Sequence, residues 1–456
     1  MVNNFILSPI IHKNIFFIGI GGVSMSGIAE ALNKSGYRVS GSDISASAFN
    51  HLNGLGIKTY LGHDKSHIGD CSLVVHTAAV GEDNAELKYA RETGVAVIDR
   101  AQLLGSMMKN YKNAIAVAGT HGKTTTTALI TEILLRAGCD PTAFIGGYYK
   151  PIGGNVRVGA SGYCVAEACE YKDSFLNFYP RIGVVLNIEE DHLDYFTDIG
   201  HIRASFNEFI NNIPAGGALV INAGCGDLKK LCAGARCEIV TFDETGADWT
   251  AEGMAENGGF FKFTPAYKNE RFERVTLRVP GKYNALNALA AIAACRAAGI
   301  NAVTAVQAVS DFNGAGRRFE YKGEVNGARV YDDYAHHPTE IKAALAAARR
   351  ICGKKIFCAF QPHNYSRTRD HFGGFTTAFD EADEILLFDI YSDREINESG
   401  VTSEDLAHAI NKRGKKARYY ENFERAAEYI LSECTDGDLI FTMGAGDVYK
   451  LQEYLI

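Results

Sequence analysis

Apolar runs of strand length alternate along the chain with amphipathic stretches of helix length. Near the N-terminus, an apolar run at 15–18 is followed by a helical stretch at 28–33 and a second strand at 37–40. The same alternation starts again at Asn113 and at Ala328. Alternation of this kind is typical of parallel sheets with helices on both faces. The pattern therefore predicts an α/β fold.

A glycine turn joins one predicted strand, residues 113–117, to the helical stretch 128–136. The turn reads Gly119-Thr120-His121-Gly122-Lys123-Thr124-Thr125. Glycines at such a turn let backbone N–H groups close around phosphate oxygens, and the helix N-terminus adds a positive dipole end. A lysine there reaches the β- and γ-phosphates, and a threonine hydroxyl holds Mg²⁺. Although it is shorter than the common G-x-x-x-x-G-K-[ST] form, the turn predicts a nucleoside triphosphate bound with Mg²⁺.

Changes in the pattern divide the chain into three predicted domains. Residues 1–109 and 314–456 are predicted to form Rossmann-like α/β domains, and residues 110–313 a central P-loop ATPase-like α/β domain. A length of 456 residues agrees with about three domains. Within the central domain, residues 237–280 predict antiparallel strands, and the alanine-rich residues 281–298 predict a buried helix.

A second glycine turn lies near the N-terminus and is similar to a dinucleotide-binding fingerprint. Gly19 and Gly21 occupy the first two glycine positions, and Asp43 follows at about the expected spacing. Ser24 stands where the third glycine belongs. The turn therefore favours backbone amides that hold a diphosphate, as in a UDP-sugar, over a nicotinamide cofactor.

Acidic side chains follow the predicted strand 163–166 of the central domain. Glu167 closes this strand, and the carboxyl ends of parallel strands face the ligand crevice. Because Mg²⁺ prefers oxygen ligands, we expect Glu167 to bind one Mg²⁺ together with Thr124. Glu170 is a competing acid, and Asp173 is expected to be solvated.

A polar cluster, residues 187–194, follows the next apolar strand, 182–186. Taken alone, such a cluster is also typical of a helix cap with surface charges. Next to a phosphate-binding turn, His192 or Asp191 becomes the better candidate for a second metal contact.

Two pairs of polar residues flank the boundary between the central and third domains. Asn284 and Asn287 are three positions apart and share one face of the predicted helix. Helix capping accounts for one of them, which leaves the other to contact a base or the phosphate site. Arg317 and Arg318 follow glycines and suit a phosphate contact from a neighbouring domain, with a solvated charged pair as the alternative.

Two histidine-containing loops follow successive predicted strands of the third domain. The first loop spans 332–340 and the second 361–368. Loops that follow neighbouring strands meet at one edge of a parallel sheet. We therefore expect both loops to line the same crevice.

Composition and charge exclude several classes of protein. Hydrophobic residues make up 46% and charged residues 22%, as in an ordinary soluble globular chain. A net charge of −8 argues against a general nucleic-acid binder. No apolar run approaches the roughly 20 residues of a membrane-spanning helix, and residues 1–13 lack the features of a signal peptide. The 11 cysteines include no C-x-x-C pair, which predicts free thiols in a reducing cytoplasm.

Taken in order, these motifs resemble the Mur ligase family, ATP-dependent enzymes that add amino acids to the peptidoglycan precursor. The resemblance covers nearly the whole chain, and the string 19–27 favours the branch that joins L-alanine to the carboxylate of UDP-N-acetylmuramate. It implies a cytoplasmic enzyme of cell-wall synthesis that uses ATP and Mg²⁺, acts through an acyl phosphate, and is a monomer or weak homodimer.

The resemblance also implies roles for individual residues. The UDP-sugar would lie on Gly19, Gly21, Gly22, Asp43, His76 and Thr77. ATP would lie on the turn 119–125 with Lys123 on the γ-phosphate, on Asn284 and Asn287, and on Asp333 at the ribose. Thr124 and Glu167 would hold one Mg²⁺ and His192 a second. Arg317 or Arg318 would contact phosphate. The amino-acid pocket would comprise Tyr334, His336, His363 and Arg367, with His336 as a candidate base.

The chain departs from the family pattern at two places. Asn364 stands where the loop usually carries an arginine after its histidine, so anchoring of the incoming carboxylate falls to Arg367 or Arg369. Some members carry a carbamylated lysine near the second metal, but no lysine occurs between Leu193 and Gly217 here. The sequence therefore predicts an unmodified metal site.

Other readings of the sequence stay open. A nicotinamide-dependent oxidoreductase would need the N-terminal turn but would leave Lys123 without a role. A P-loop kinase or regulatory ATPase would use Lys123 without forming an amide. Within the family, a later-step or tripeptide-recycling ligase is the alternative, and the preference for L-alanine over glycine or serine is not decided by the sequence.

Overall fold

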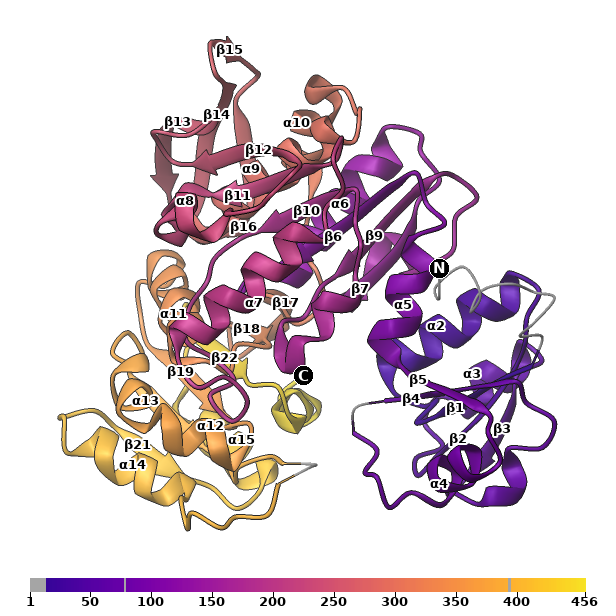
Figure 1. The fold of residues 1–456 in the computed structure, drawn as a ribbon. Coiled ribbons are helices and arrows are strands. Elements are labelled where there is room, and N and C mark those ends of the chain that lie inside the picture. Colours follow the sequence, from indigo (N-terminus) through magenta and orange to yellow (C-terminus); the bar gives the residue numbers. More distant parts are fainter. Residues whose placement is uncertain (1–13, 78, 393–394) are drawn as a thin grey trace.

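A computed structural model describes residues 14–77, 79–392 and 395–456. Residues 1–13, on which the signal-peptide prediction rests, lie outside the described residues. The chain forms three separate sheets, and this confirms the predicted three-domain α/β class. Figure 1 shows the central domain at the top, with the first domain at lower right and the third domain at lower left.

The first domain is a parallel sheet with the order β3-β2-β1-β4-β5. Its strands are β1 Asn14–Ile18, β2 Arg38–Asp43, β3 Lys58–Leu61, β4 Leu73–His76 and β5 Ala96–Asp99. Its helices are α2 Val23–Lys34, α3 Phe49–Gly54, η1 Lys65–His67, α4 Ala85–Glu92 and α5 Arg100–Met108. The first helix begins at Val23, five residues before the predicted stretch, because the glycine turn ends at Gly22.

The central domain has an eleven-stranded sheet ordered β15-β14-β13-β12-β11-β10-β6-β9-β7-β8, with β16 paired to β14. Its strands are β6 Asn113–Ala118, β7 Thr142–Tyr149, β8 Gly154–Arg157, β9 Tyr163–Glu167, β10 Ile182–Val185, β11 Ala218–Asn222, β12 Glu238–Asp243, β13 Trp249–Asn257, β14 Phe260–Tyr267, β15 Glu270–Arg271 and β16 Val275–Pro280. The prediction of antiparallel strands from residue 237 is wrong for β12, which pairs in parallel with both β11 and β13. Antiparallel pairing begins only between β13 and β14.

Helices cover both faces of the central sheet. They are α6 Lys123–Arg136, η2 Lys150–Ile152, η3 Tyr171–Asn177, α7 Ile199–Asn211, η4 Ala223–Cys225, α8 Leu228–Leu231, α9 Lys282–Ala297 and α10 Ala302–Asp311. The alanine-rich α9 is buried along most of its length, as predicted. Its small side chains let it pack closely against α6, the helix that follows the phosphate-binding turn.

The third domain has a six-stranded sheet ordered β17-β18-β22-β19-β20-β21. Its strands are β17 Glu320–Val325, β18 Ala328–Asp333, β19 Ile356–Phe360, β20 Glu384–Leu387, β21 Ala417–Tyr419 and β22 Leu439–Met443. Its helices are α11 Pro338–Ile351, α12 Tyr365–Asp370, α13 Phe372–Ala378, α14 Ser403–Asn411, α15 Phe423–Glu433 and η5 Asp447–Tyr454. Only β17 runs antiparallel, and separate apolar clusters cover the two faces.

The first and central domains pack together through two helices of the first domain. A Cβ atom at Gly27 of α2 would lie 2.1 Å from the Val156 side chain of β8, and one at Gly105 of α5 would lie 2.0 Å from the Asn177 carbonyl oxygen. Glycine therefore permits a close approach at both places. Among the described helices, none combines the length and the apolar character needed to cross a bilayer.

Candidate active site

The phosphate-binding turn connects β6 to α6, and two of its glycines adopt positive φ angles, which glycine tolerates better than other residues. Gly119 has φ of 140° and Gly122 has φ of 85°. The Asn187 side chain holds the turn, because its Oδ1 accepts a hydrogen bond from the His121 N–H (2.7 Å) and its Nδ2 donates to the His121 carbonyl (3.1 Å). A Cβ at Gly122 would lie 2.6 Å from Oδ1 of Asn287, so this helix residue contacts the turn as well.

The Lys123 ammonium lies inside the turn. Its Nζ donates to the carbonyls of Gly119 (2.5 Å) and Thr120 (3.0 Å), and to the carboxylate of Glu170 (3.0 Å). Burial opposes the charged form, but the Glu170 carboxylate more than offsets this and raises the pKa of Lys123. Glu170, expected only as a competing acid, is thus a buried counter-ion of Lys123.

Thr124 and Glu167, the predicted Mg²⁺ ligands, both lie against the glycine pair Gly146 and Gly147. A Cβ at Gly146 would lie 2.5 Å from a Glu167 carboxylate oxygen, and one at Gly147 would lie 3.4 Å from the Thr124 methyl group. A hydroxyl and a carboxylate are ligands that Mg²⁺ accepts. The donor set at this place therefore fits Mg²⁺.

The two tandem arginines have different surroundings. Arg318 donates from Nη2 to the Thr124 hydroxyl (3.1 Å) and so crosses from the third domain to the phosphate-binding turn. Arg317 donates to the Asp332 carboxylate (3.0 Å) and to the Gly444 carbonyl (2.6 Å) within the third domain. Of the two predicted phosphate contacts, the structure brings Arg318 to the turn and holds Arg317 away from it.

A cavity of about 190 Å³ lies beside the turn, between the central and third domains. Its lining combines apolar groups with Asn284, Asn287 and Asp333. Asn284 does not cap α9, whose N-cap is Gly281; its Nδ2 instead donates to the Pro280 carbonyl (2.7 Å), and its Oδ1 accepts from Asn287 (3.2 Å).

Asp333 closes β18 at the edge of the same cavity. Its carboxylate accepts backbone N–H groups of Phe319 (2.8 Å) and Ala335 (2.7 Å). Burial outweighs the neighbouring Arg318 charge and raises the pKa of Asp333 to about 6. The carboxylate is therefore fixed in position and ionised near neutral pH.

His121 joins the turn to the third domain. Its Nδ1 lies 3.0 Å from Oε1 of Glu340, and its Nε2 lies 3.5 Å from Oε2 of Glu189. Burial alone would lower its pKa, but the Glu340 and Glu189 carboxylates raise the pKa of His121 to about 10. His121 is therefore an imidazolium that bridges two acids at neutral pH.

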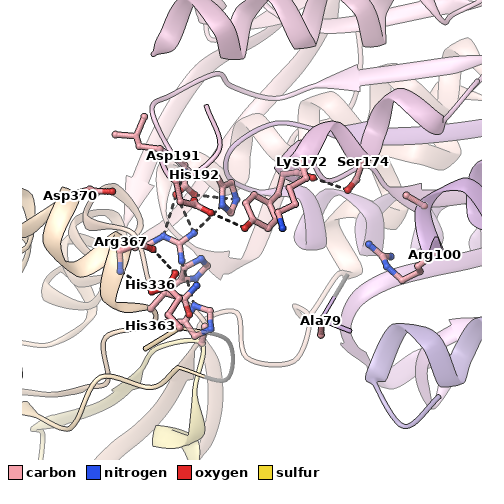
Figure 2. A pocket seen from close by; sticks show the side chains of 18 of the residues that line it. Ala79, Arg100, Lys172, Ser174, Asp191, His192, His336, His363, Arg367 and Asp370 are labelled. Atoms are coloured by element: carbon pink, nitrogen blue, oxygen red, sulfur yellow. Dashed lines mark hydrogen bonds and ion pairs between the residues drawn. The ribbon is translucent and has the colours of Figure 1, made fainter. Parts of the chain in front are cut away.

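A larger cleft of about 920 Å³ is lined by all three domains. It brings together the first-domain residue His76 with the predicted amino-acid residues Tyr334, His336, His363 and Arg367. Figure 2 shows His336, His363 and Arg367 close to Asp191 and His192, with Arg100 across the opening. The two histidine loops therefore share one crevice, as the sequence predicts.

Arg367 is held by an acid of the central domain. Its Nε (3.2 Å) and Nη2 (3.1 Å) both donate to Oδ1 of Asp191. Both side chains are buried. Burial raises the pKa of Asp191, but the Arg367 guanidinium outweighs this and holds that pKa well below its usual range.

His336 is a neutral imidazole with a defined tautomer. The Tyr334 carbonyl accepts a hydrogen bond from Nδ1 (2.9 Å), which leaves the lone pair on Nε2. Burial lowers the pKa of His336 to about 3. Because a base this weak does not readily take a proton from an ammonium group, the structure argues against the expected base role and favours a hydrogen-bond acceptor.

His192 has left-handed backbone, with φ of 56°. Its ring packs against Tyr171, with the centroids 4.6 Å apart, and its Nε2 lies 3.8 Å from Oδ2 of Asp191. Burial lowers the pKa of His192, so its ring is neutral at physiological pH.

The N-terminal glycine turn differs from its prediction. The N–H groups of Gly19 and Ile20 donate to the Ser42 carbonyl, that of Gly21 to the Asp43 carboxylate (2.8 Å), and that of Gly22 to the Gly19 carbonyl. The amides expected to hold a diphosphate are therefore paired within the domain. Donors for an anion are available instead at the start of α2, which Gly22 precedes without a side-chain cap.

The other predicted sugar-nucleotide residues lie at the same sheet edge. His76 ends β4, lines the larger cleft and has its Nδ1 3.2 Å from the Thr77 carbonyl oxygen. The Thr77 methyl group packs where a Cβ at Gly19 would lie (2.5 Å). Thr77 therefore shapes the glycine turn rather than facing the cleft opening.

Sequence reasoning missed Arg100. It is the first residue of α5, lines the larger cleft and donates from Nη1 to the Ser24 hydroxyl (3.1 Å). Ser24, which replaces the third glycine of the fingerprint, thus orients a cation at the cleft. A lone arginine at a helix start carries no sequence signal for this contact.

Asp173 was expected to be solvated, and this is wrong. Its carboxylate accepts hydrogen bonds from the Tyr195 and Ser205 hydroxyls. These contacts hold Lys172 and Asp173 in consecutive left-handed conformations, with φ of 51° and 54°. The strained segment places Lys172 at the larger cleft.

The fold is that of a three-domain α/β protein. Its central domain carries the phosphate-binding turn, and the outer domains contribute to the clefts beside it. Family models match in the same order: the Mur ligase family catalytic domain at residues 14–112, the Mur ligase middle domain at 117–295, and the Mur ligase glutamate ligase domain at 317–446. The chain belongs to the Mur ligase family.

Curated relatives and solved structures agree with this assignment. The chain is 46% identical to the UDP-N-acetylmuramate–L-alanine ligase of Clostridium acetobutylicum, over 99% of both chains. It is 48% identical to that of Acetivibrio thermocellus, over 99% of this chain and 97% of the relative. The crystal structure of the UDP-N-acetylmuramate–alanine ligase from Thermotoga maritima has a TM-score of 0.82 at 30% identity, covering 97% of this chain and 98% of that one.

Proposed function

We infer that this protein is an ATP-dependent ligase that joins L-alanine to the carboxylate of UDP-N-acetylmuramate in peptidoglycan precursor synthesis. The observation that carries this inference is the full-length identity of 44–48% to curated ligases of this name. The geometry supports it, because the phosphate-binding turn lines a cavity between the central and third domains, and a larger cleft lined by all three domains contains Arg367, which is paired with Asp191.

The reaction that follows has two chemical steps. A muramoyl carboxylate oxygen attacks the γ-phosphorus of ATP, so that ADP leaves and an acyl phosphate forms. The neutral amine of L-alanine then attacks the acyl carbon, and collapse of the tetrahedral intermediate expels phosphate and leaves the amide. The amine loses its proton to solvent or to a group of the cleft. Positioning and charge neutralisation supply most of the catalysis in such reactions.

We propose that the turn 119–125 and the smaller cavity bind ATP. Lys123 would exchange its contacts with the turn carbonyls for the phosphates, with Glu170 keeping it charged and placed. Arg318 would reach the phosphates from the third domain, because it already contacts Thr124. The cavity lined by Asn284, Asn287 and Asp333 would take the nucleoside.

We propose that Mg²⁺ is held by Thr124 and Glu167, with His192 as a contact to a second ion. The chemistry that bound Mg²⁺ supplies is neutralisation of negative charge on the phosphates. The unmodified metal site predicted from the absence of a nearby lysine stays a prediction.

We propose that the larger cleft binds the sugar nucleotide and the amino acid. The start of α2, Arg100 and His76 would receive the UDP-sugar. Arg367 would anchor the carboxylate of the amino acid, since Asp191 fixes its direction and one guanidinium nitrogen remains directed toward His363 (3.4 Å). His336 and Tyr334 would border the amine.

The domain limits 1–109, 110–313 and 314–456 are likewise proposals, as are a monomeric or weakly dimeric state and a cytoplasmic location. The three sheets support the limits, because β5, β16 and β17 fall on the expected sides of the two boundaries.

Phosphate release from ATP tests the proposal. Release in the presence of Mg²⁺ should require both UDP-N-acetylmuramate and L-alanine, and Lys123→Ala should abolish it. A panel of glycine, L-serine and the tripeptide would identify the preferred acceptor. Release without the sugar nucleotide would indicate a plain ATPase, and a preference for the tripeptide would indicate a recycling ligase.

A further inference from the structure

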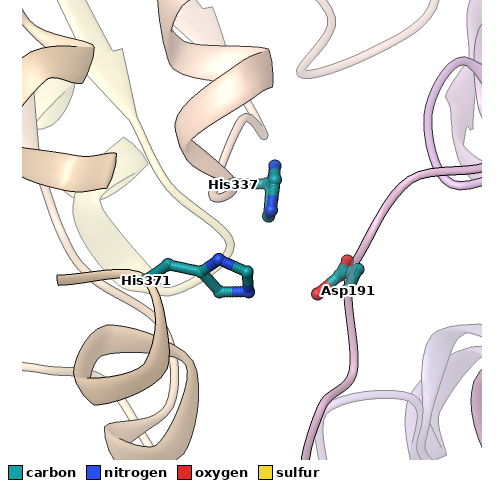
Figure 3. Close-up of side chains that lie close together, drawn as sticks. All are labelled: Asp191, His337 and His371. Atoms are coloured by element: carbon teal, nitrogen blue, oxygen red, sulfur yellow. The ribbon is translucent and has the colours of Figure 1, made fainter. Parts of the chain in front are cut away.

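Asp191, His337 and His371 form a compact cluster at the junction of the central and third domains. One potential ligand atom from each residue lies within 4.8 Å of the other two. Figure 3 shows the imidazoles of His337 and His371 facing the Asp191 carboxylate across this junction. We propose that these three side chains form a binding site for a transition-metal ion of the Zn²⁺ class. The cluster shares Asp191 with the proposed amino-acid pocket, but the proposal does not depend on the reaction inferred above.

Three different elements bring the ligands together. Asp191 lies in the loop after β10 of the central domain, His337 is the N-cap of α11, and His371 lies at the junction of α12 and α13. The rings of His337 and His371 meet edge to face, with the centroids 4.7 Å apart. A bound ion would therefore tie the third domain to the central domain.

The donor set selects the class of metal. Two imidazole nitrogens and one carboxylate oxygen suit Zn²⁺ and its neighbours in the first transition row, and leave a coordination position open. Mg²⁺ prefers oxygen ligands, so the cluster differs in kind from the Thr124 and Glu167 pair.

The Asp191 carboxylate leaves one of its two oxygens available to an ion. Its Oδ1 is the atom that accepts from Arg367, which leaves Oδ2 as the ligand atom.

An unpaired buried atom is the independent observation that points to a ligand. Nε2 of His337 is buried and has no hydrogen-bond partner among the residues that the structure describes. A buried polar atom without a partner costs about 1–3 kcal/mol unless a ligand or water satisfies it. Metal coordination at Nε2 would move the ring proton to Nδ1 and give up the 3.3 Å contact from the Thr339 N–H. Glu340 would still accept from the backbone N–H of the N-cap residue His337 (3.4 Å).

Binding of Co²⁺ and Zn²⁺ to the untagged, full-length protein tests the proposal. With excess Mg²⁺ present and no nucleotide, we expect one Co²⁺ per chain with an intense tetrahedral visible spectrum, displaced by Zn²⁺. No thiolate-to-cobalt charge-transfer band should accompany it, which separates this site from the cysteines. His371→Ala should weaken Zn²⁺ binding at least tenfold, and His371→Cys should restore it with a new charge-transfer band.

Two variants control for other histidines. His408→Ala changes an exposed histidine of α14 and should leave Zn²⁺ binding unchanged. His192→Ala tests the neighbouring ring. The proposal is overturned if His371→Ala binds Zn²⁺ as tightly as the parent, or if His192→Ala rather than His371→Ala abolishes binding. Circular dichroism of each variant shows that a loss of binding does not come from unfolding.

Discussion

Neighbouring residues can carry the same charge and serve different purposes, as Arg317 and Arg318 do. Arg318 crosses to Thr124 at the phosphate-binding turn, and Arg317 neutralises the buried Asp332 inside the third domain. Burial raises the pKa of Asp332 in spite of this neighbour, which marks how poorly that carboxylate is solvated. The two arginines are adjacent and identical in type, so the sequence does not distinguish them. The directions of their side chains in the fold separate the two roles.

Alanine substitutions should separate the two arginines. Arg318→Ala should lower kcat/KM for ATP by roughly 10²-fold, because a charge at the phosphates is lost, and should lower the unfolding free energy by only about 1 kcal/mol, the contribution of its hydrogen bond to Thr124. Arg317→Ala should instead cost roughly 2–3 kcal/mol of stability. This lies below the range for fully buried pairs, because the Arg317 side chain is 25% exposed. Urea unfolding and steady-state kinetics measure both. Equal stability losses in the two variants would contradict the assignment.

At the scale of elements, glycines set how closely α5 approaches the segment Tyr171–Asn177. A Cβ at Gly105 would meet the backbone of Asn177 at 2.0 Å, so the two elements touch through main-chain atoms. The segment carries Lys172 in its strained conformation to the edge of the larger cleft. Packing of α5 is therefore linked to the shape of the proposed substrate site.

Gly105→Ala should destabilise the protein by about 1–3 kcal/mol, because backbone atoms must move to admit the methyl group. Gly54→Ala is the matched control, since a Cβ there meets nothing within 4 Å. That change should be neutral or stabilising by up to about 1 kcal/mol. Thermal unfolding of both variants checks the difference, and a similar effect at the two positions would show that close packing at α5 is not the cause.

For the whole molecule, several polar contacts hold the third domain against the central one, and three of them involve residues of the proposed sites. They are Arg318 with Thr124, His121 with Glu340, and Arg367 with Asp191. Each contact joins a residue near the proposed ATP site or the proposed amino-acid pocket to a residue of the other domain. Packing of the third domain against the central one therefore brings the residues of both proposed sites together.

The His121 contact predicts a pH dependence of stability. The pKa of His121 is raised in the fold, so its contribution is fully present below the ordinary histidine pKa of about 6.5 and is lost as the pH rises toward about 10. Glu340→Gln should reduce this loss of stability between pH 6.5 and 10. Thermal midpoints across that range test it, with the exposed Glu404→Gln as control. Parallel curves for Glu340→Gln and the parent would contradict the prediction.

The Asp191 contact predicts a selective effect on the amino-acid substrate. Asp191→Asn should raise KM for the amino acid ten- to hundredfold and change KM for ATP less, because it frees Arg367 from its fixed direction. Glu190→Gln, at an exposed neighbour, should have little effect. Equal changes in both KM values would indicate a general loss of the fold instead.

The sequence by itself determined the features that depend on contiguous residues. Strand–helix alternation specified three α/β domains, and the turn 119–125 was readable because strand, glycines and helix follow one another directly. The alanine-rich helix, α9, was predictable for the same reason. Local backbone chemistry was sufficient for all of these.

Tertiary structure alone decided the features that depend on partners far apart in the chain. The Asp43 carboxylate and the Ser42 carbonyl accept hydrogen bonds from the amides of the N-terminal glycine turn. The strand β12 joins the parallel part of its sheet, and Glu170 pairs with Lys123. Arg367 meets Asp191 across a domain boundary, at a separation of 176 residues. Such contacts follow from how strands, helices and domains pack together, because hydrogen bonding and desolvation act through space, and spacing along the chain gives no guide to distance.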